Sequence, residues 1–216
     1  MSAPETHRVR GLYAVTDPDL CPGERVLDAG AAALRGGAAM LQYRDKHADT
    51  ATRRHRAARL ALLCQEYGAL FIVNDDPALA AEVEADGVHL GQSDGRIDAA
   101  RTMLGSGKLI GVSCHGSLEL ARQAAEEGAD YLALGRFFPS RTKPQAPPAD
   151  LDTLREARRR FRQPLVAIGG INADNAASLI EAGADAVAVI HGLFGAPDDA
   201  AVEAAARRLA GLFAHR

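Results

Sequence analysis

Hydrogen-bond donors recur at every second position in the stretch 41–46, which reads Leu-Gln-Tyr-Arg-Asp-Lys. If this stretch continues the strand that starts just before it, Gln42, Arg44 and Lys46 project from one face, because side chains alternate along a strand. An unpaired buried charge is costly, so two cations on one strand face indicate an anion opposite them. For this pattern taken alone, a polar strand face that meets water is the favoured interpretation, so the rest of the chain must supply the anion.

Two aspartates follow neighbouring apolar runs further along the chain. Asp75 comes directly after the run 70–74, and Asp94 follows the run 87–90 by a short turn. Carboxylates at neighbouring strand ends can share a hard cation that prefers oxygen ligands and keeps several waters, which indicates Mg²⁺. The alternatives are a helix N-cap before Pro77 for Asp75 and a cap or turn residue for Asp94. Together, and opposite the cations, the pair favours a metal site.

Three histidines, His89, His115 and His191, also follow or end apolar runs and could in principle form a zinc site. They lack the close pairwise spacing typical of zinc ligands. We therefore favour His89 as a histidine of the core whose ring nitrogens are satisfied by hydrogen bonds.

Gly169 and Gly170 end another apolar run and lead into residues 172–175, which read Asn-Ala-Asp-Asn and predict a helix start. Small residues at such a junction let a phosphate approach backbone N–H groups, so a phosphate site is favoured over a simple tight turn. The loop 140–143, Ser-Arg-Thr-Lys, adds hydroxyls and a cation suited to a lid over an anion. A solvated loop is the alternative, especially for Arg141.

Short, near-continuous apolar runs alternate with amphipathic, alanine-rich stretches, which is typical of a parallel sheet covered by helices. Eight strands are predicted: Gly11–Thr16, Met40–Arg44, Leu70–Asn74, Gly87–Leu90, Leu109–Cys114, Tyr131–Gly135, Leu165–Gly170 and Ala186–Ile190. Helices are predicted at Glu24–Arg35, Asp49–Tyr67, Ser117–Glu127 and Asn172–Glu181, among others. This repeat predicts a single (β/α)8 barrel, with its site at the carboxyl ends of the strands. A doubly wound sheet is the runner-up, but its GxGxxG turn is missing.

Composition sets further limits. The 216 residues are 47% hydrophobic and carry a net charge of -3, which disfavours general nucleic-acid binding. Three scattered cysteines indicate a reduced, cytoplasmic protein, and no stretch has the length of a membrane span or the pattern of a signal peptide. We expect residues 1–8 to be a disordered arm and 9–216 to form the catalytic barrel. The sequence does not decide the oligomeric state, and a homo-oligomer is compatible with it.

Six motifs stand at the ends of the second to seventh predicted strands: Gln42-x-Arg44-x-Lys46, Asn74-Asp75, Gly87-Val88-His89-Leu90-Gly91-Gln92-Ser93-Asp94, Gly111-Val112-Ser113, Ser140-x-Thr142-Lys143 and Ile168-Gly169-Gly170-Ile171. In this order, over nearly the whole chain from Gly11 to Phe194, they resemble the thiamine-phosphate synthase family. The resemblance implies a (β/α)8 barrel that joins a hydroxymethylpyrimidine pyrophosphate to a thiazole phosphate and releases pyrophosphate.

The resemblance also implies roles for individual residues. It places Mg²⁺ on Asp75 and Asp94 and the pyrimidine pyrophosphate on Gln42, Arg44, Lys46, Asn74, Ser113 and Lys143. Of these, Arg44, Lys46, Ser113 and Lys143 would be catalytic. It assigns the thiazole phosphate to Ser140, Thr142, Gly170, Ile190 and His191. Two positions depart from the family pattern, which often has threonine at Ser140 and serine at His191; only the second exchange puts a side-chain hydroxyl contact in doubt.

Two other functions fit parts of the pattern. A thiazole tautomerase shares the barrel and the phosphate site but does not need the cations and carboxylates at Arg44, Lys46, Asp75 and Asp94. A barrel that only senses a phosphorylated metabolite would be expected to have lost some of these residues. The pattern fits a thiazole with or without a carboxylate. It assigns no role to Cys114 or His115.

Overall fold

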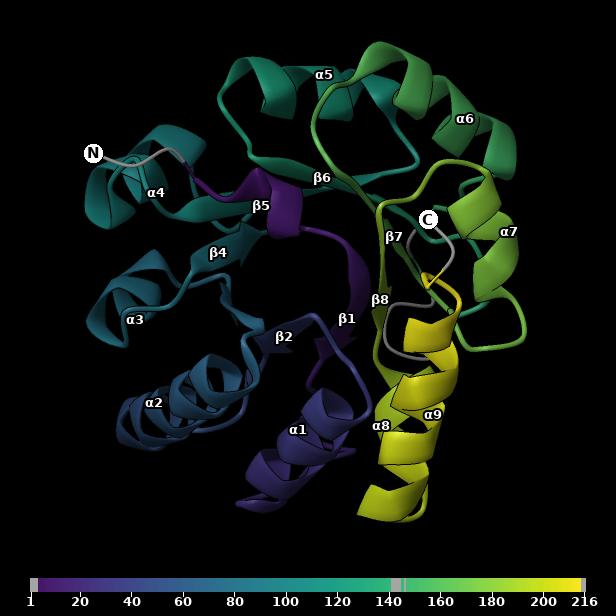
Figure 1. Cartoon of the computed structure of the whole chain (residues 1–216). Helices are drawn as coiled ribbons and strands as arrows, with labels where there is room; N and C mark the ends of the chain where they lie inside the picture. Colours follow the sequence, from purple (N-terminus) through teal and green to yellow (C-terminus); the bar gives the residue numbers. More distant parts are fainter. Residues whose placement is uncertain (1–3, 141–144, 146, 215–216) are drawn as a thin grey trace.

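Every strand of the chain pairs in parallel with the strand before it, and β8 returns to pair with β1, so the sheet closes into a barrel (Figure 1). The computed structural model describes residues 4–140, 145 and 147–214. The strands are β1 Gly11–Val15, β2 Met40–Tyr43, β3 Leu70–Asn74, β4 Gly87–Leu90, β5 Leu109–His115, β6 Tyr131–Gly135, β7 Leu165–Ile168 and β8 Ala186–Val189. The predicted single (β/α)8 barrel is confirmed.

Helices surround the barrel, as the view in Figure 1 shows. They are α1 Arg25–Arg35, α2 Thr50–Tyr67, α3 Pro77–Glu82, α4 Ile97–Leu104, α5 Leu118–Glu126, α6 Leu151–Arg160, α7 Ala176–Glu181, α8 His191–Phe194 and α9 Asp199–Gly211. Side-chain caps define several starts, because an oxygen at the N-cap accepts a hydrogen bond from an orphan backbone N–H. Asp49 caps α2 and Ser117 caps α5 in this way. The last helix, α9, closes the ring beside α1, where a Cβ on Gly36 would lie 2.4 Å from Ala206.

The core has two layers because successive side chains of a strand point to opposite faces. Outward side chains such as Leu12, Leu41 and Phe71 pack under the helices. Inward side chains, including Tyr13, Met40 and Tyr131, fill the barrel interior. A barrel of eight strands is just wide enough for side chains to fill it, so the interior forms a solid floor beneath the strand ends.

Several predicted boundaries differ from the structure by a few residues, and three of them show why. β2 ends at Tyr43, because the Arg44 N–H donates to Thr16 Oγ1 at 2.9 Å instead of continuing the sheet. β7 ends at Ile168 rather than at Gly170. α7 begins at Ala176 rather than at Asn172, since the side chain of Asn175 accepts from the Asn172 N–H and fixes a turn there.

One short element lies within residues 1–8, which the sequence predicts to be an arm. Residues Thr6–Arg8 form a short 3₁₀ helix, η1. The Arg8 side chain anchors it by donating to the Gly68 carbonyl at 3.0 Å and by pairing with Glu5. Val9, which follows, is buried. Among the described residues, no helix is both long and apolar enough to cross a membrane.

Candidate active site

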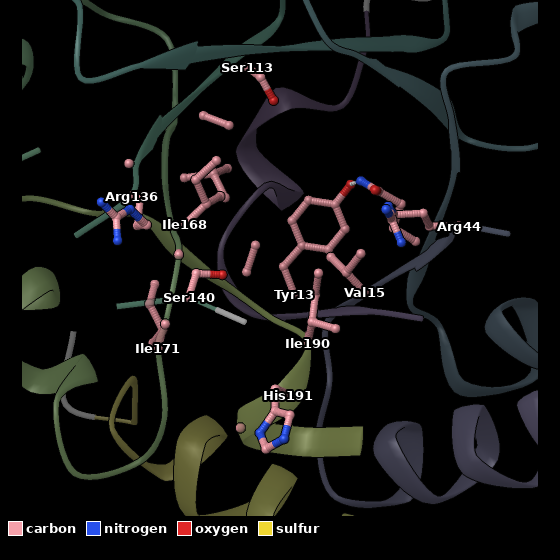
Figure 2. Close-up of a pocket in the computed structure, with 18 of the residues that line it drawn as sticks. Tyr13, Val15, Arg44, Ser113, Arg136, Ser140, Ile168, Ile171, Ile190 and His191 are labelled. Carbon is pink, nitrogen blue, oxygen red and sulfur yellow. Dashed lines mark hydrogen bonds between the residues drawn. The ribbon is translucent and has the colours of Figure 1, made fainter. Parts of the chain in front are cut away.

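A cavity of about 320 Å³ opens where the strands end, and residues at the ends of all eight strands contribute to its lining. Figure 2 shows the ring of Tyr13 near its centre, with Arg44 on one side and Ser140 and Ile171 on the other. Ligand sites of (β/α)8 barrels lie at this end of the strands. The cavity has the size of a small-molecule site.

Arg44 lines one side of this cavity and is held by the end of β1. Its Nη1 donates to Asp17 Oδ2 at 3.0 Å, and its backbone N–H donates to Thr16 Oγ1. Both charged side chains are largely buried, with 16% and 11% of their surface exposed. The guanidinium is therefore oriented before any ligand arrives, because one edge of it is fixed by a carboxylate.

Lys46 leaves the line of the strand and lies at the rim, where its Nζ is 2.9 Å from Asp75 Oδ2. Burial is the largest single influence on the Asp75 carboxyl and raises its pKa. The hydrogen bond and charge of Lys46, together with the neighbouring side chains of Asp94 and Asn74, outweigh burial and hold that pKa below its usual value. Asp75 is thus a carboxylate at neutral pH, and its side chain lies within hydrogen-bond reach of Asp94.

The cap alternatives for the two aspartates do not apply. The N-cap of α3 is Asp76, whose side chain accepts from the Leu79 N–H at 3.0 Å. The residue at the N-cap of α4 is Arg96, not Asp94. Asp75 instead has φ of 61°, a left-handed conformation that is uncommon outside glycine and clusters at functional sites.

The paired carboxylates of Asp75 and Asp94 fit a hard divalent cation. They lie side by side, and in the structure a lysine ammonium supplies positive charge beside them. The part of the chain that the structure describes contains no group of three or more His, Cys, Asp or Glu side chains that could hold a metal. The remaining positions around a cation here would be filled by water and by oxygens of a ligand, which is the arrangement that Mg²⁺ favours.

Glycines form the opposite wall, where the loops after β6, β7 and β8 touch. A Cβ on Gly170 would lie 2.4 Å from the Pro139 carbonyl oxygen, and one on Gly192 would lie 2.3 Å from the Ile171 oxygen. Asn175 fixes this corner by donating to the Gly170 carbonyl at 3.1 Å. Bare backbone therefore lines this wall, and small residues of this kind let a phosphate approach main-chain donors.

The structure brings most of the predicted site residues together. Those that line the cavity are Gln42, Arg44, Asn74, Ser113, Ser140, Gly170, Ile190 and His191. Lys46, Asp75 and Asp94 form the adjacent rim cluster. Thr142 and Lys143, like Arg141 beside them, lie outside the described residues.

Sequence reasoning missed several residues that line the cavity or hold its side chains. Tyr13 occupies its centre, Asp17 holds Arg44, and Arg136 lines the wall near Gly169. Asp17 had a usable signal, since a charged residue directly after an apolar run belongs to a strand end. Tyr13 had none, because an aromatic residue inside a strand looks like ordinary core.

His89, His115 and Cys114 lie in three different surroundings. His89 is hydrogen bonded through both ring nitrogens, to Tyr131 and to Ser113, as expected for a satisfied histidine of the core. His115 lines the cavity at an irregularity of β5. Cys114 faces the opposite way, into the layer under the helices, where burial raises the pKa of its thiol to about 12. That thiol is protonated at neutral pH and takes no part in the cavity.

Taken together, the fold and the site define a (β/α)8-barrel enzyme architecture with cations and carboxylates on one side of a strand-end cavity and a glycine-lined wall on the other. The profile of the thiamine monophosphate synthase family matches residues 12–193. The chain belongs to this family, as the motifs predicted.

Individual relatives agree with that assignment. A thiamine-phosphate synthase of Alcanivorax borkumensis is 65% identical over 207 residues, covering 96% of this chain and 95% of the relative. One of Thioalkalivibrio sulfidiphilus is 55% identical, covering 95% and 96%. The solved structure of thiamine phosphate pyrophosphorylase from Pyrococcus furiosus superposes with a TM-score of 0.86 at 38% identity, covering 96% of both chains.

Proposed function

We propose that this barrel is a thiamine-phosphate synthase that joins 4-amino-2-methyl-5-hydroxymethylpyrimidine pyrophosphate to a thiazole phosphate. The products are thiamine phosphate and pyrophosphate. Family membership and the names of relatives at 65% and 55% identity support this activity. Buried, unpaired cysteine thiols fit the cytoplasmic location expected from the sequence.

One observation carries the proposal at the level of the site. The cavity lies between two chemically different regions that each suit an anion, the cation and carboxylate side at Arg44, Lys46 and Asp75 and the backbone-lined wall at Gly170. A reaction between one pyrophosphate and one monophosphate substrate needs two such regions with room for two rings between them. The floor between them is uncharged and hydrogen bonded, which suits neutral heterocycles.

Mg²⁺ is the metal that we propose for Asp75 and Asp94, and it would supply charge stabilisation to the departing pyrophosphate. Arg44 is oriented toward the same group by Asp17, and Lys46 lies next to the carboxylate pair. The sequence motif adds Lys143, outside the described residues, as a further cation. Such preorganised charges act mainly on the charge that develops as the carbon–oxygen bond breaks.

The reaction is proposed as a dissociative substitution. The bond from the pyrimidine methylene carbon to the pyrophosphate oxygen breaks, and both electrons leave with pyrophosphate. The electron-rich aminopyrimidine stabilises the cation that remains, and the thiazole nitrogen then donates its lone pair to the methylene carbon. The barrel contributes by holding the two rings in line within one cavity.

A direct assay tests the proposal. The purified protein is mixed with the pyrimidine pyrophosphate, the thiazole phosphate and Mg²⁺, and thiamine phosphate and pyrophosphate are measured with and without EDTA. We expect both products in equal amounts and their loss with EDTA. If neither product forms with both substrates present, the activity is refuted; product formation that EDTA does not affect would refute only the metal. Running the assay with carboxylated and decarboxylated thiazole phosphates identifies the second substrate.

The glycine-lined wall gives a matched pair of variants. Gly170→Ala and Gly68→Ala place alanine at nearly the same backbone angle, φ of 69° and 66°, but only Gly170 meets neighbouring atoms within 4 Å. The left-handed angle costs about 1–2 kcal/mol in each variant, and the overlap at Gly170 adds about 1–3 kcal/mol. We expect KM for the thiazole phosphate to rise about 10-fold or more in Gly170→Ala alone, through loss of about one good hydrogen bond. Equal KM values in the two variants would contradict a phosphate site at this wall.

A further inference from the structure

Five polar side chains from five different strands form one continuous hydrogen-bond chain across the barrel interior. Gln42 Nε2 donates to the Tyr13 hydroxyl at 2.6 Å, and that hydroxyl lies 3.0 Å from the hydroxyl of Tyr131. The Tyr131 hydroxyl lies 3.1 Å from His89 Nδ1, and His89 Nε2 lies 2.8 Å from Ser113 Oγ. We call these five residues the floor chain.

Packing holds the floor chain rigidly. The ring of Tyr131 stacks on His89 with centroids 5.6 Å apart and meets Tyr13 edge to face at 6.3 Å. Gly111 makes space for the Tyr131 ring, because a Cβ at that position would lie 1.9 Å from its Cζ atom. Glycine at the start of the Gly111-Val112-Ser113 motif therefore has a packing reason inside the barrel.

Tyr131 differs from the rest of the floor chain in its relation to the cavity. Tyr13, Gln42, His89 and Ser113 all line the cavity, whereas Tyr131 has no exposed surface and is not part of the lining. A ligand in the cavity therefore meets Ser113, whose hydroxyl is seen at the edge of the site in Figure 2, but does not meet Tyr131. Any influence of Tyr131 on a ligand passes through its neighbours in the floor chain, Tyr13 and His89, and only His89 connects it to Ser113.

Hydrogen counting gives the floor chain one direction. Burial raises the pKa of both tyrosines, so each hydroxyl keeps its single hydrogen. The Tyr13 oxygen accepts from Gln42, and its own hydrogen then goes to Tyr131, since a buried hydroxyl hydrogen without an acceptor is costly. The Tyr131 hydrogen is left for His89 Nδ1, and the proton of the neutral imidazole is then on Nε2, facing Ser113 Oγ.

We infer that Tyr131 is a positioning residue that, through the Nε2–H tautomer of His89, turns the Ser113 hydroxyl hydrogen toward the cavity. Ser113 Oγ accepts from His89 and therefore presents its own O–H as a donor. A donor on this wall matches a ligand atom with an exposed lone pair, such as a ring nitrogen of an aminopyrimidine. The identity of that ligand rests on the proposed function, whereas the direction of the floor chain does not.

Nitrogen-15 NMR of the protein without substrates tests the direction of the floor chain. Histidine is labelled, and the signals of His89 among the seven histidines are identified by their loss in His89→Gln. We expect a neutral ring with its proton on Nε2. In Tyr131→Phe the Nδ1 resonance should move toward that of a nitrogen without a hydrogen bond. Tyr13→Phe is the matched control, because it also removes one buried hydroxyl but leaves the donor to His89 in place.

Kinetics test the consequence for the ligand. Tyr131→Phe should raise KM for the pyrimidine pyrophosphate about 10-fold, the value of one directed hydrogen bond. We expect KM for the thiazole phosphate to stay within about 3-fold, because the Ser113 hydroxyl that Tyr131 orients faces the pyrimidine in this proposal. We expect kcat to stay within about 3-fold as well, because a hydrogen bond made equally to the bound substrate and to the transition state changes KM alone. Loss of folded protein alone would lower kcat and leave KM unchanged, so the split separates positioning from structural damage.

Substitutions of His89 allow a rescue experiment, because glutamine can accept and donate hydrogen bonds in the same direction as the proposed tautomer of His89. In His89→Gln the amide oxygen can accept from Tyr131 and the amide N–H can donate to Ser113, whereas His89→Leu can do neither. We expect KM for the pyrimidine pyrophosphate to stay within about 3-fold of the parent in His89→Gln and to rise about 10-fold in His89→Leu, for the loss of one hydrogen bond.

Each result bears on the inference directly. It is overturned if His89 carries its proton on Nδ1, if its Nδ1 resonance is the same in Tyr131→Phe as in the parent, or if glutamine and leucine at position 89 raise KM equally. If the protein makes no thiamine phosphate at all, the proposed function fails, while the NMR result still decides the direction of the floor chain.

Discussion

Replacing Arg44 by alanine is expected to lower kcat/KM for the pyrimidine pyrophosphate by about 100- to 1000-fold while the barrel still folds, the usual loss for one preorganised donor to a developing charge. Arg44 lines the cavity and is aimed by Asp17 at a distance of 3.0 Å. Its charge is therefore in place before the pyrophosphate begins to leave. Steady-state kinetics with purified, folded protein measure the effect.

The buried partner of Arg44 complicates a single substitution, because Asp17 is left with an unpaired carboxylate in Arg44→Ala. The unpaired Asp17 carboxylate lowers the free energy of unfolding by about 1–3 kcal/mol. The double variant Arg44→Ala/Asp17→Asn removes the unpaired charge and should recover most of the stability but none of the activity. Arg207→Ala is the control, because Arg207 is an exposed arginine of α9 that pairs with Glu203. Turnover of Arg44→Ala within a few-fold of the parent would refute the role of Arg44.

The fold was predictable because periodicity is a property of whole segments. Three strands, β3, β4 and β6, have the predicted ends, and the other five differ by one or two residues. The errors have local causes that the pattern of apolar residues does not contain. β2 stops when the Arg44 N–H turns to Thr16, a residue 28 positions away, and α7 starts late because Asn175 folds back on Asn172. Side-chain hydrogen bonds of this kind compete with regular secondary structure.

The site was predictable at the strand ends and not inside the strands. Charged residues that directly follow apolar runs, such as Arg44 and Asp75, are conspicuous, and the barrel places all strand ends on one rim. Tyr13 and Tyr131 are different, since an aromatic residue in a strand fits the core equally well. The polar floor becomes visible only in the hydrogen-bond distances that join the two tyrosine hydroxyls, His89 and Ser113. These residues come from strands that are far apart in the sequence, so no local pattern predicts the contacts.

Lys46 shows the limit of strand periodicity most clearly. Its position two residues after Arg44 suggested one continuous ladder of donors. Because β2 ends at Tyr43, Lys46 is instead directed to the carboxylate of Asp75 on the rim. The same pairing links the cationic side of the site to the proposed metal, since a divalent cation on Asp75 and Asp94 would compete with the lysine for the same oxygens.

Neutralising either proposed metal ligand should have the second large effect. We expect Asp75→Asn and Asp94→Asn each to lower kcat about 100-fold at a Mg²⁺ concentration that saturates the parent. Half-saturation by Mg²⁺ should shift upward by about 10-fold or more, because the amide keeps an oxygen ligand but loses the charge that attracts the cation. Excess Mg²⁺ should then restore part of the rate.

The neighbouring aspartate is the natural control, because Asp76 differs from Asp75 by one position and points elsewhere. Its side chain caps α3 and pairs with Arg53 at 2.9 Å. Asparagine is also a good N-cap, so Asp76→Asn should keep both the fold and the Mg²⁺ dependence. Calorimetry of pyrophosphate binding with and without Mg²⁺ adds a readout independent of turnover. If Asp75→Asn and Asp76→Asn have the same Mg²⁺ half-saturation, the metal does not bind at Asp75, and the Lys46–Asp75 pair is then an ion pair that only stabilises the rim.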